Sequence, residues 1–220
     1  MKSVCLVVRS YNRPDYLKST MLSLLQSDIE LCSRRLIYDD CSSNQETRNI
    51  LNDPQLTKVK NKEFQVIIGE KNLGCKHSYK KALENANDCE YICVVDNDVN
   101  VKPNFIQKLY DTYEDAFNVY KHEHLLLTGF NPTNAHINCI IEKHPTFYRK
   151  ETCGGINYFF HSKFKQYIQD KWSIDHDNYV QRSMKRDKYP LVCMNEGVVQ
   201  HIGEIGLHSN KRRYDLDSNF

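Results

Sequence analysis

The sequence predicts a single α/β domain in which helices flank a mostly parallel central sheet. Two observations predict this fold class. Short apolar runs alternate with segments whose apolar residues recur at helical spacing throughout the first 105 residues. One of these runs, Tyr91–Val95, is apolar at every position, which is typical of a strand buried on both faces of a parallel sheet. Such a βαβ order places the carboxyl ends of the strands at one edge.

The individual elements follow from the same signals, taken in chain order. The expected strands are Val4–Val8, Arg35–Tyr38, Phe64–Ile68, Tyr91–Val95, Leu125–Thr128, Ile137–Ile141, Val192 and Val198–Val199. The expected helices begin at Pro14, after the turn Asn72-Leu73-Gly74, at Pro103 and at Asp175, and the last of them ends at Arg186. Asn12 is the expected N-cap of the first helix. After residue 124 the alternation is interrupted, and we expect a smaller, mixed second sheet there.

Length and composition limit the class of protein. A chain of 220 residues favours one domain, and 40% hydrophobic with 26% charged residues excludes a disordered chain. The net charge of +2 predicts no nucleic-acid partner. We expect no membrane span, because no apolar run is long enough, and no signal peptide, because the N-terminus enters the first strand directly. The nine cysteines lie mostly in apolar segments, which favours reduced thiols and a cytoplasmic location, or the host cytoplasm for a viral protein.

The segment Asp96-Asn97-Asp98 follows the buried strand directly and carries the most functional information. In open α/β sheets, ligands bind beyond the carboxyl ends of the strands. Two carboxylates two residues apart repel each other unless a cation lies between them. Oxygen ligands suit hard divalent ions such as Mg²⁺ or Mn²⁺. The alternative is a solvated turn, since Asp and Asn favour turns.

Two further loops fall on the same predicted edge. In the loop that follows the first strand, Tyr11 is expected to stack on a base and Arg13 to reach a phosphate, the alternative being a simple helix cap. After the second strand come Asp39 and Asp40. A carboxylate there can accept from a base N–H or a ribose hydroxyl, and the alternative is an Asx turn.

A fourth loop, Asn72 to His77, opens a helix. Gly74 lets backbone N–H groups approach a ligand at the helix start, and Lys76 adds positive charge beside them. The spacing of a phosphate-binding GxxxxGK loop is absent. We therefore expect a weaker phosphate contact here.

The four loops together resemble the family 2 glycosyltransferases of the GT-A fold. The resemblance rests on Val7–Pro14, Tyr38–Ser43, Asn72–Gly74 and Val94–Asp98, in that order. It implies a single domain over 1–220, with a nucleotide-sugar-binding half at 1–105 and an acceptor and catalytic half at 106–209. It also implies inverting transfer from a UDP-, GDP- or dTDP-sugar to a glycan or glycosylated acceptor, with Mn²⁺ or Mg²⁺ as cofactor. The tail at 210–220 is polar, and we expect it to be flexible.

The resemblance also implies roles for individual residues. Substrate would be bound by Ser10, Tyr11, Arg13, Asp39, Asp40, Asn72, Gly74, Lys76, Asp96, Asn97, Gly154 and Gly155. Among these, Asp39 would contact the base, and Asp96 would face the ribose or the metal. The metal ligands would be Asp96, Asp98 and His201. Lys76-His77 departs from the family, because many members carry a small residue and an Arg there.

The second half of the chain resembles the family only loosely. The catalytic base would be Asp177 or Asp175, and we prefer Asp177 because it lies five residues before Arg182. The alternative is that helix-start carboxylates only offset the macrodipole. The pair Gly154-Gly155 is either a plain turn or shapes an acceptor pocket in which Tyr158 and Phe159 stack on sugar. His201 is alternatively a structural histidine.

Two other functions remain open from the sequence. The run Val94–Val99 also resembles the nucleophile strand of haloacid-dehalogenase-type phosphohydrolases, in which Asp96 would attack phosphate covalently. A later strand ending in paired acids, which that class needs, is missing. The second alternative is a catalytically inactive nucleotide-sugar-binding module.

Overall fold

The computed structural model describes residues 2–132, 139–172, 177–204, 217 and 220. Its strands are β1 (Val4–Ser10), β2 (Arg34–Asp39), β3 (Gln65–Ile68), β4 (Tyr91–Asp96), β5 (Val99–Val101), β6 (Leu126–Thr128), β7 (Ile140–Lys143), β8 (Phe147–Lys150), β9 (Asn157–His161), β10 (Leu191–Met194) and β11 (Val199–His201). Its helices are α1 (Pro14–Gln26), α2 (Gln45–Asn52), α3 (Pro54–Thr57), α4 (Gly74–Glu84), α5 (Phe105–Tyr120), α6 (Lys165–Lys171) and α7 (Asp177–Asp187), with short 3₁₀ turns at Ile29–Leu31 and Ser162–Phe164.

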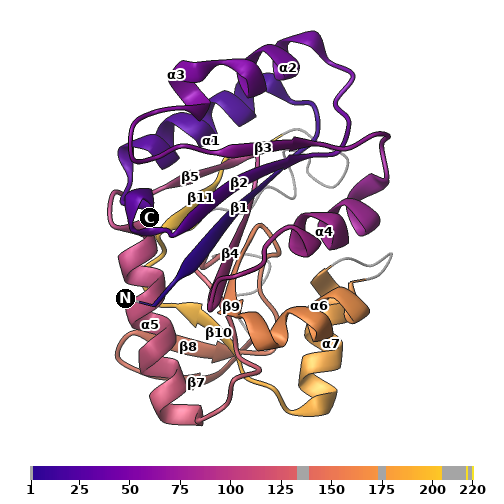
Figure 1. Ribbon diagram of the computed structural model, residues 1–220. Helices are drawn as coiled ribbons and strands as arrows, with labels where there is room; N and C mark the ends of the chain where they lie inside the picture. Colours follow the sequence, from indigo (N-terminus) through magenta and orange to yellow (C-terminus); the bar gives the residue numbers. More distant parts are fainter. Residues whose placement is uncertain (1, 133–138, 173–176, 205–216, 218–219) are drawn as a thin grey trace.

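The described strands form one large sheet and one small one (Figure 1). The large sheet has the order β3-β2-β1-β4-β9-β6-β10-β8-β7. Its first four strands are parallel, as the alternating pattern predicted, and β10 is parallel to β6. Strand β9 runs antiparallel between β4 and β6 and joins the two halves of the chain. The small sheet pairs β5 with β11 in antiparallel fashion.

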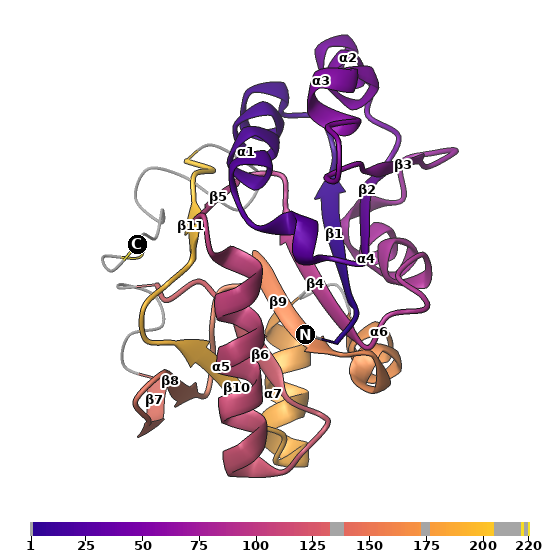
Figure 2. The same ribbon diagram turned by 60° about the vertical axis from the view of Figure 1, so that its left-hand side comes forward.

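Helices cover both faces of the sheet (Figure 2), and each face has its own apolar cluster. Alternate residues of β1 point to opposite faces because a strand has a period of two. Leu6 belongs to the cluster that includes side chains of α1 and α5, whereas Val7 belongs to the cluster that includes side chains of α4, α6 and α7. The alternation explains why β1 and β4 read as continuous apolar runs: both of their faces are buried.

Several expectations need correction. Asn12 is not the N-cap of α1, because Arg13 precedes Pro14 in that position and makes no side-chain cap. Helices α2, α3 and α6 and strands β5, β8 and β9 were not predicted. The expected strand Ile137–Ile141 is described only from residue 139, and β7 begins at Ile140. Most of the tail at 210–220, which is expected to be flexible, lies outside the described residues. Asp217 is described, is 6% exposed and accepts a hydrogen bond from the backbone of Asn131.

Two further properties bear on the cellular expectations. Within the described part of the chain, no helix is both long enough and apolar enough to cross a membrane. All nine cysteines are free thiols.

Candidate functional site

A cavity of about 260 Å³ lies at the carboxyl ends of β1, β2 and β4, beside the start of α4. It is lined by Arg9, Ser10, Tyr11, Arg13, Asp40, Asn72, Gly74, Cys75, Ser78, Asp96 and Asn97. The strand register brings these residues together, because Arg9 pairs with Asp96 and Ser10 pairs with Asp39 on neighbouring strands. All four loops singled out in the sequence contribute to this one cavity.

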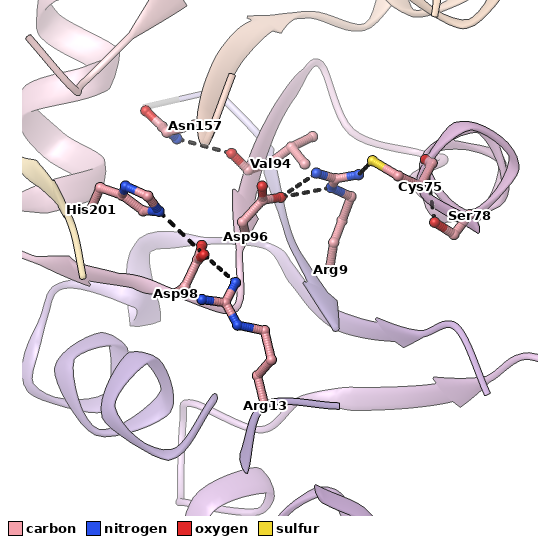
Figure 3. Close-up of polar contacts among 9 residues, drawn as sticks. All are labelled: Arg9, Arg13, Cys75, Ser78, Val94, Asp96, Asp98, Asn157 and His201. Carbon is pink, nitrogen blue, oxygen red and sulfur yellow. Dashed lines mark hydrogen bonds and ion pairs between the residues drawn. The ribbon is translucent and has the colours of Figure 1, made fainter. Parts of the chain in front are cut away.

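The guanidinium of Arg9 pairs with Asp96 within the cavity lining (Figure 3). Its Nε donates to Oδ1 of Asp96 at 2.9 Å, Nη2 donates to the same oxygen, and Nη1 donates to Sγ of Cys75 at 3.6 Å. The guanidinium carbon lies 4.6 Å from the ring centroid of Tyr79 and 5.6 Å from that of Trp172, and these rings stack with centroids 3.5 Å apart. Burial raises the pKa of Asp96, although the charge of Arg9 opposes this.

A second polar cluster surrounds Asp98. Nη1 of Arg13 donates to Oδ2 of Asp98 at 2.6 Å, and Nε2 of His201 lies 3.2 Å from the same oxygen (Figure 3). A Cβ on Gly203 would lie within 3 Å of the ends of these three side chains, so a larger residue there would require the cluster to shift. Burial alone would raise the pKa of Asp98. The hydrogen bond and charge of His201, together with the charge of Arg13, outweigh burial and hold this pKa below its usual value.

Asp98 and His201 have donor atoms that fit a divalent cation. Oδ1 of Asp98 is buried and has no hydrogen-bond partner within the described ranges. A buried acceptor of this kind needs a partner, and carboxylate with imidazole can ligate a transition metal such as Mn²⁺. In the expected three-residue set, Asp96 differs from the other two, because Arg9 donates to its Oδ1. Among the described residues, no three His, Cys, Asp or Glu side chains are grouped closely enough to hold a metal.

The two aspartates at the end of β2, Asp39 and Asp40, hold loops in place. Asp39 accepts from the backbone N–H of Ser42 at 2.7 Å and from its hydroxyl at 2.6 Å, which is the Asx turn given above as the alternative. Asp40, not Asp39, lines the cavity. Its carboxylate accepts from the backbone N–H groups of Leu73 and Gly74, each at 2.9 Å. These N–H groups, expected to face a phosphate, are therefore already bonded.

Asp177 is the first residue of α7 and is half-buried. Burial raises the pKa of Asp177 to about 6, and the charge of Asp96 adds to this. Backbone N–H groups at the helix start and the charge of Arg9 act in the opposite direction. A Cβ on Gly155 would lie 2.7 Å from the Asp177 carboxyl group, so this glycine allows close approach. Asp175 lies outside the described residues.

The expectation of an aromatic acceptor pocket after Gly154 is not met by the described conformation. Tyr158 and Phe159 are 1% and 0% exposed and belong to the core, so no sugar can stack on them. A Cβ on Gly154 would lie 2.9 Å from the ring of Phe130, which fixes this residue as glycine for packing.

Comparison with known proteins identifies the family. A profile described as Glycosyl transferase family 2 matches residues 5–176. The chain belongs to this family. No curated protein sequence matches the chain. Among solved structures, GalNAc-T7 with UDP, GalNAc and Mn²⁺ matches 91% of the chain with a TM-score of 0.69 and 13% identity. S. aureus TarS matches 90% of it with a TM-score of 0.62 and 16% identity.

The solved structures show that this family 2 glycosyltransferase chain has the GT-A fold. The chain spans only 43% of the GalNAc-T7 chain and 36% of the TarS chain. The family match also leaves the phosphohydrolase alternative without support, and the Arg9 pair explains the position of Asp96 without a nucleophilic role.

Sequence reasoning missed three cavity residues of this family 2 chain: Arg9, Cys75 and Ser78. The sequence does hold a signal for Arg9, because a charged residue there directly follows the apolar run Val4–Val8 and precedes the polar loop. Cys75 and Ser78 lie one helical turn apart in α4 and share a face. Lys76, which was expected to bind phosphate, is half-buried and does not line the cavity.

Proposed function

We propose that the chain is an inverting glycosyltransferase that moves a sugar from a nucleotide-diphosphate donor to a hydroxyl of a glycan or glycosylated acceptor. Mn²⁺ or Mg²⁺ would be its cofactor. The observation that carries this proposal is one cavity formed by four loops, with a carboxylate of raised pKa beside it. Asp177 is near enough to Asp96 and Arg9 for their charges to shift its pKa.

The donor nucleotide would occupy the cavity in the half formed by residues 1–105. The hydroxyl of Ser10 is buried and has no hydrogen-bond partner among the residues that the structure describes. A ligand in the cavity would supply one. Tyr11 is 42% exposed at the cavity, which leaves its ring free to stack on a base. Asp40 and Asn97 bring further polar atoms to the lining.

Asp98 and His201 would hold the divalent cation. When bound, the cation neutralises the negative charge that develops on the departing diphosphate. Arg13 would support the same end, because its guanidinium already lies on Asp98 and can also bind a phosphate oxygen. Asp96 would act differently, with its carboxylate fixed by Arg9 and available to a ribose or sugar hydroxyl.

Asp177 would remove the proton from the acceptor hydroxyl as it attacks the anomeric carbon. A base works best when its pKa is close to the working pH, and a pKa of about 6 leaves Asp177 ionised yet basic at neutral pH. Attack on the face opposite the leaving diphosphate inverts the configuration. Asp175 remains the alternative base.

Thermal-shift measurements with UDP, GDP and dTDP, each with Mn²⁺ and again with a chelator, test this proposal. A nucleotide at about 100 times its Kd stabilises the folded state by about 2.7 kcal/mol. For a domain of this size, that corresponds to a rise in Tm of about 5–10 °C. We expect one nucleotide to give such a rise with Mn²⁺ and a smaller rise with the chelator. No shift with any of the three would overturn the proposal.

A further inference from the structure

The side-chain amide of Gln181 is buried beneath the candidate base. Gln181 is 1% exposed and lies one helical turn after Asp177 in α7. Its Oε1 accepts from the backbone N–H of Cys153 at 3.0 Å. Its Nε2 donates to the carbonyl of Cys153 at 2.8 Å and to the hydroxyl of Tyr158 at 2.9 Å. Because an amide nitrogen carries only two hydrogens, its third contact, with Oδ2 of Asp177 at 3.3 Å, shares one of them. The amide thus ties α7 to the segment before β9.

Asp177 is held from two sides by this arrangement. Gly155, two residues beyond Cys153, lies so close that a Cβ there would be 2.7 Å from Oδ2 of Asp177. Nε2 of Gln181 lies 3.3 Å from that same oxygen and shares a hydrogen with it. One strand-side glycine and one helix-side amide therefore limit where the carboxylate can point. Because Gln181 is anchored at both polar ends, it is a rigid donor and not a mobile one.

We propose that Gln181 is a positioning residue for transfer, which orients Oδ2 of Asp177 and leaves Oδ1 to accept the acceptor proton. This inference rests on the proposed role of Asp177 as the base. A base displaced by about 1 Å loses up to about 100-fold in rate, so the positioning contact affects turnover strongly. Nucleotide binding should not change, because Gln181 does not line the donor cavity.

The charged groups around Asp177 make the role of Gln181 measurable through pH. The charge of Asp96, on β4, raises the pKa of Asp177. The charge of Arg9, on β1, and the backbone N–H groups at the start of α7 lower it. Replacing the Gln181 amide with a carboxyl group would add an acid about 3.3 Å from Asp177. Two acids sharing a site cannot both ionise easily, so the apparent pKa of the pair rises.

Steady-state kinetics of Gln181→Met and Gln181→Glu test the inference. Activity is measured as nucleoside diphosphate release from UDP-, GDP- and dTDP-sugars, with Mn²⁺, and with water or a mixture of methyl glycosides as acceptor. We expect Gln181→Met to lower kcat about 10–100-fold at unchanged donor KM. We expect Gln181→Glu to move the acidic limb of the kcat–pH profile upward by about one pH unit. If the Met variant does not fold, the Glu variant still tests the inference, because it keeps the shape of the side chain.

A matched control is the exposed pair on α6, where Nε2 of Gln166 donates to Asp170 at 2.8 Å. Gln166→Glu should leave kcat and the pH profile unchanged. Folded Gln181 variants with wild-type kcat and an unmoved profile overturn the inference. If they behave so while Asp177→Asn is inactive, only the inference fails. If Asp177→Asn remains active, the proposed function of Asp177 fails first.

Discussion

Replacing Asp177 with Asn separates the chemistry of the proposed base from the fold. The amide keeps the shape of the carboxyl group and cannot take a proton. General-base catalysis contributes about 10²–10⁴ in rate, so transfer should fall by that factor. Mn²⁺-dependent nucleotide binding should be unchanged, because Asp177 does not line the donor cavity. The readouts are nucleoside diphosphate release and thermal shift with UDP, GDP and dTDP.

The same variant has a predictable effect on the pH dependence of stability. The folded-state pKa of Asp177 is about 6, raised from 3.8, and this difference corresponds to at most about 3 kcal/mol. Partial exposure reduces it to about 1–3 kcal/mol. Because the folded-state pKa is raised, Asp177 contributes this free energy of unfolding to the wild type in full below pH 4. The contribution is lost as the pH rises through 6. The Asn variant should not lose it.

Urea unfolding of both proteins between pH 4 and pH 8 measures this difference in the free energy of unfolding. We expect the variant to gain about 1–3 kcal/mol relative to the wild type over that range. Parallel stability curves would show that Asp177 has an ordinary pKa and would refute the electrostatic argument. Retained turnover in Asp177→Asn, with Asp175→Asn inactive, would move the base to Asp175.

Three further substitutions have expected outcomes. Gly155→Ala should lower kcat at least 10-fold without weakening nucleotide binding in thermal-shift assays, because the new Cβ displaces Asp177; an unchanged kcat would contradict the contact. Ser10→Ala should weaken nucleotide affinity about 3–10-fold by titration while the free energy of unfolding stays the same, since the hydroxyl has no partner in the described structure; equal affinity would exclude a ligand contact. Arg9→Met should lower the free energy of unfolding by about 2 kcal/mol in urea, because Asp96 loses its counterion, and a Lys control should lose less; an unaffected Met variant would contradict the pair.

The parallel half of the fold can be predicted from the sequence because each of its strands is marked by its own residues. Strands β1, β2 and β4 are apolar runs that end in polar loops, and parallel order places those loops at one edge. The cavity loops were therefore predictable. Strand β9 was not, because Gly154-Gly155 and a row of aromatic residues hide its period. Helix α2 was missed because it is mostly polar, with few buried side chains.

The roles of neighbouring acids were harder to predict than their location. Asp39 and Asp40 are adjacent carboxylates, and only the turn geometry decides that Asp40 reaches the cavity while Asp39 bonds Ser42. Asp96 and Asp98 likewise differ in role because the fold gives each a different partner. Arg9 forms an ion pair with Asp96, whereas Arg13 and His201 contact Asp98. Such partners are distant in sequence, so spacing alone does not reveal them.

Titration calorimetry of Mn²⁺ and Mg²⁺ into the protein, alone and with UDP, GDP or dTDP, tests the central claim most directly. Because linked ligands strengthen each other, we expect cation binding that one of the three nucleotides tightens, and loss of that binding in Asp98→Asn. Absence of any heat of binding for either cation, with or without every nucleotide, would contradict a metal-assisted donor site at Asp98 and His201.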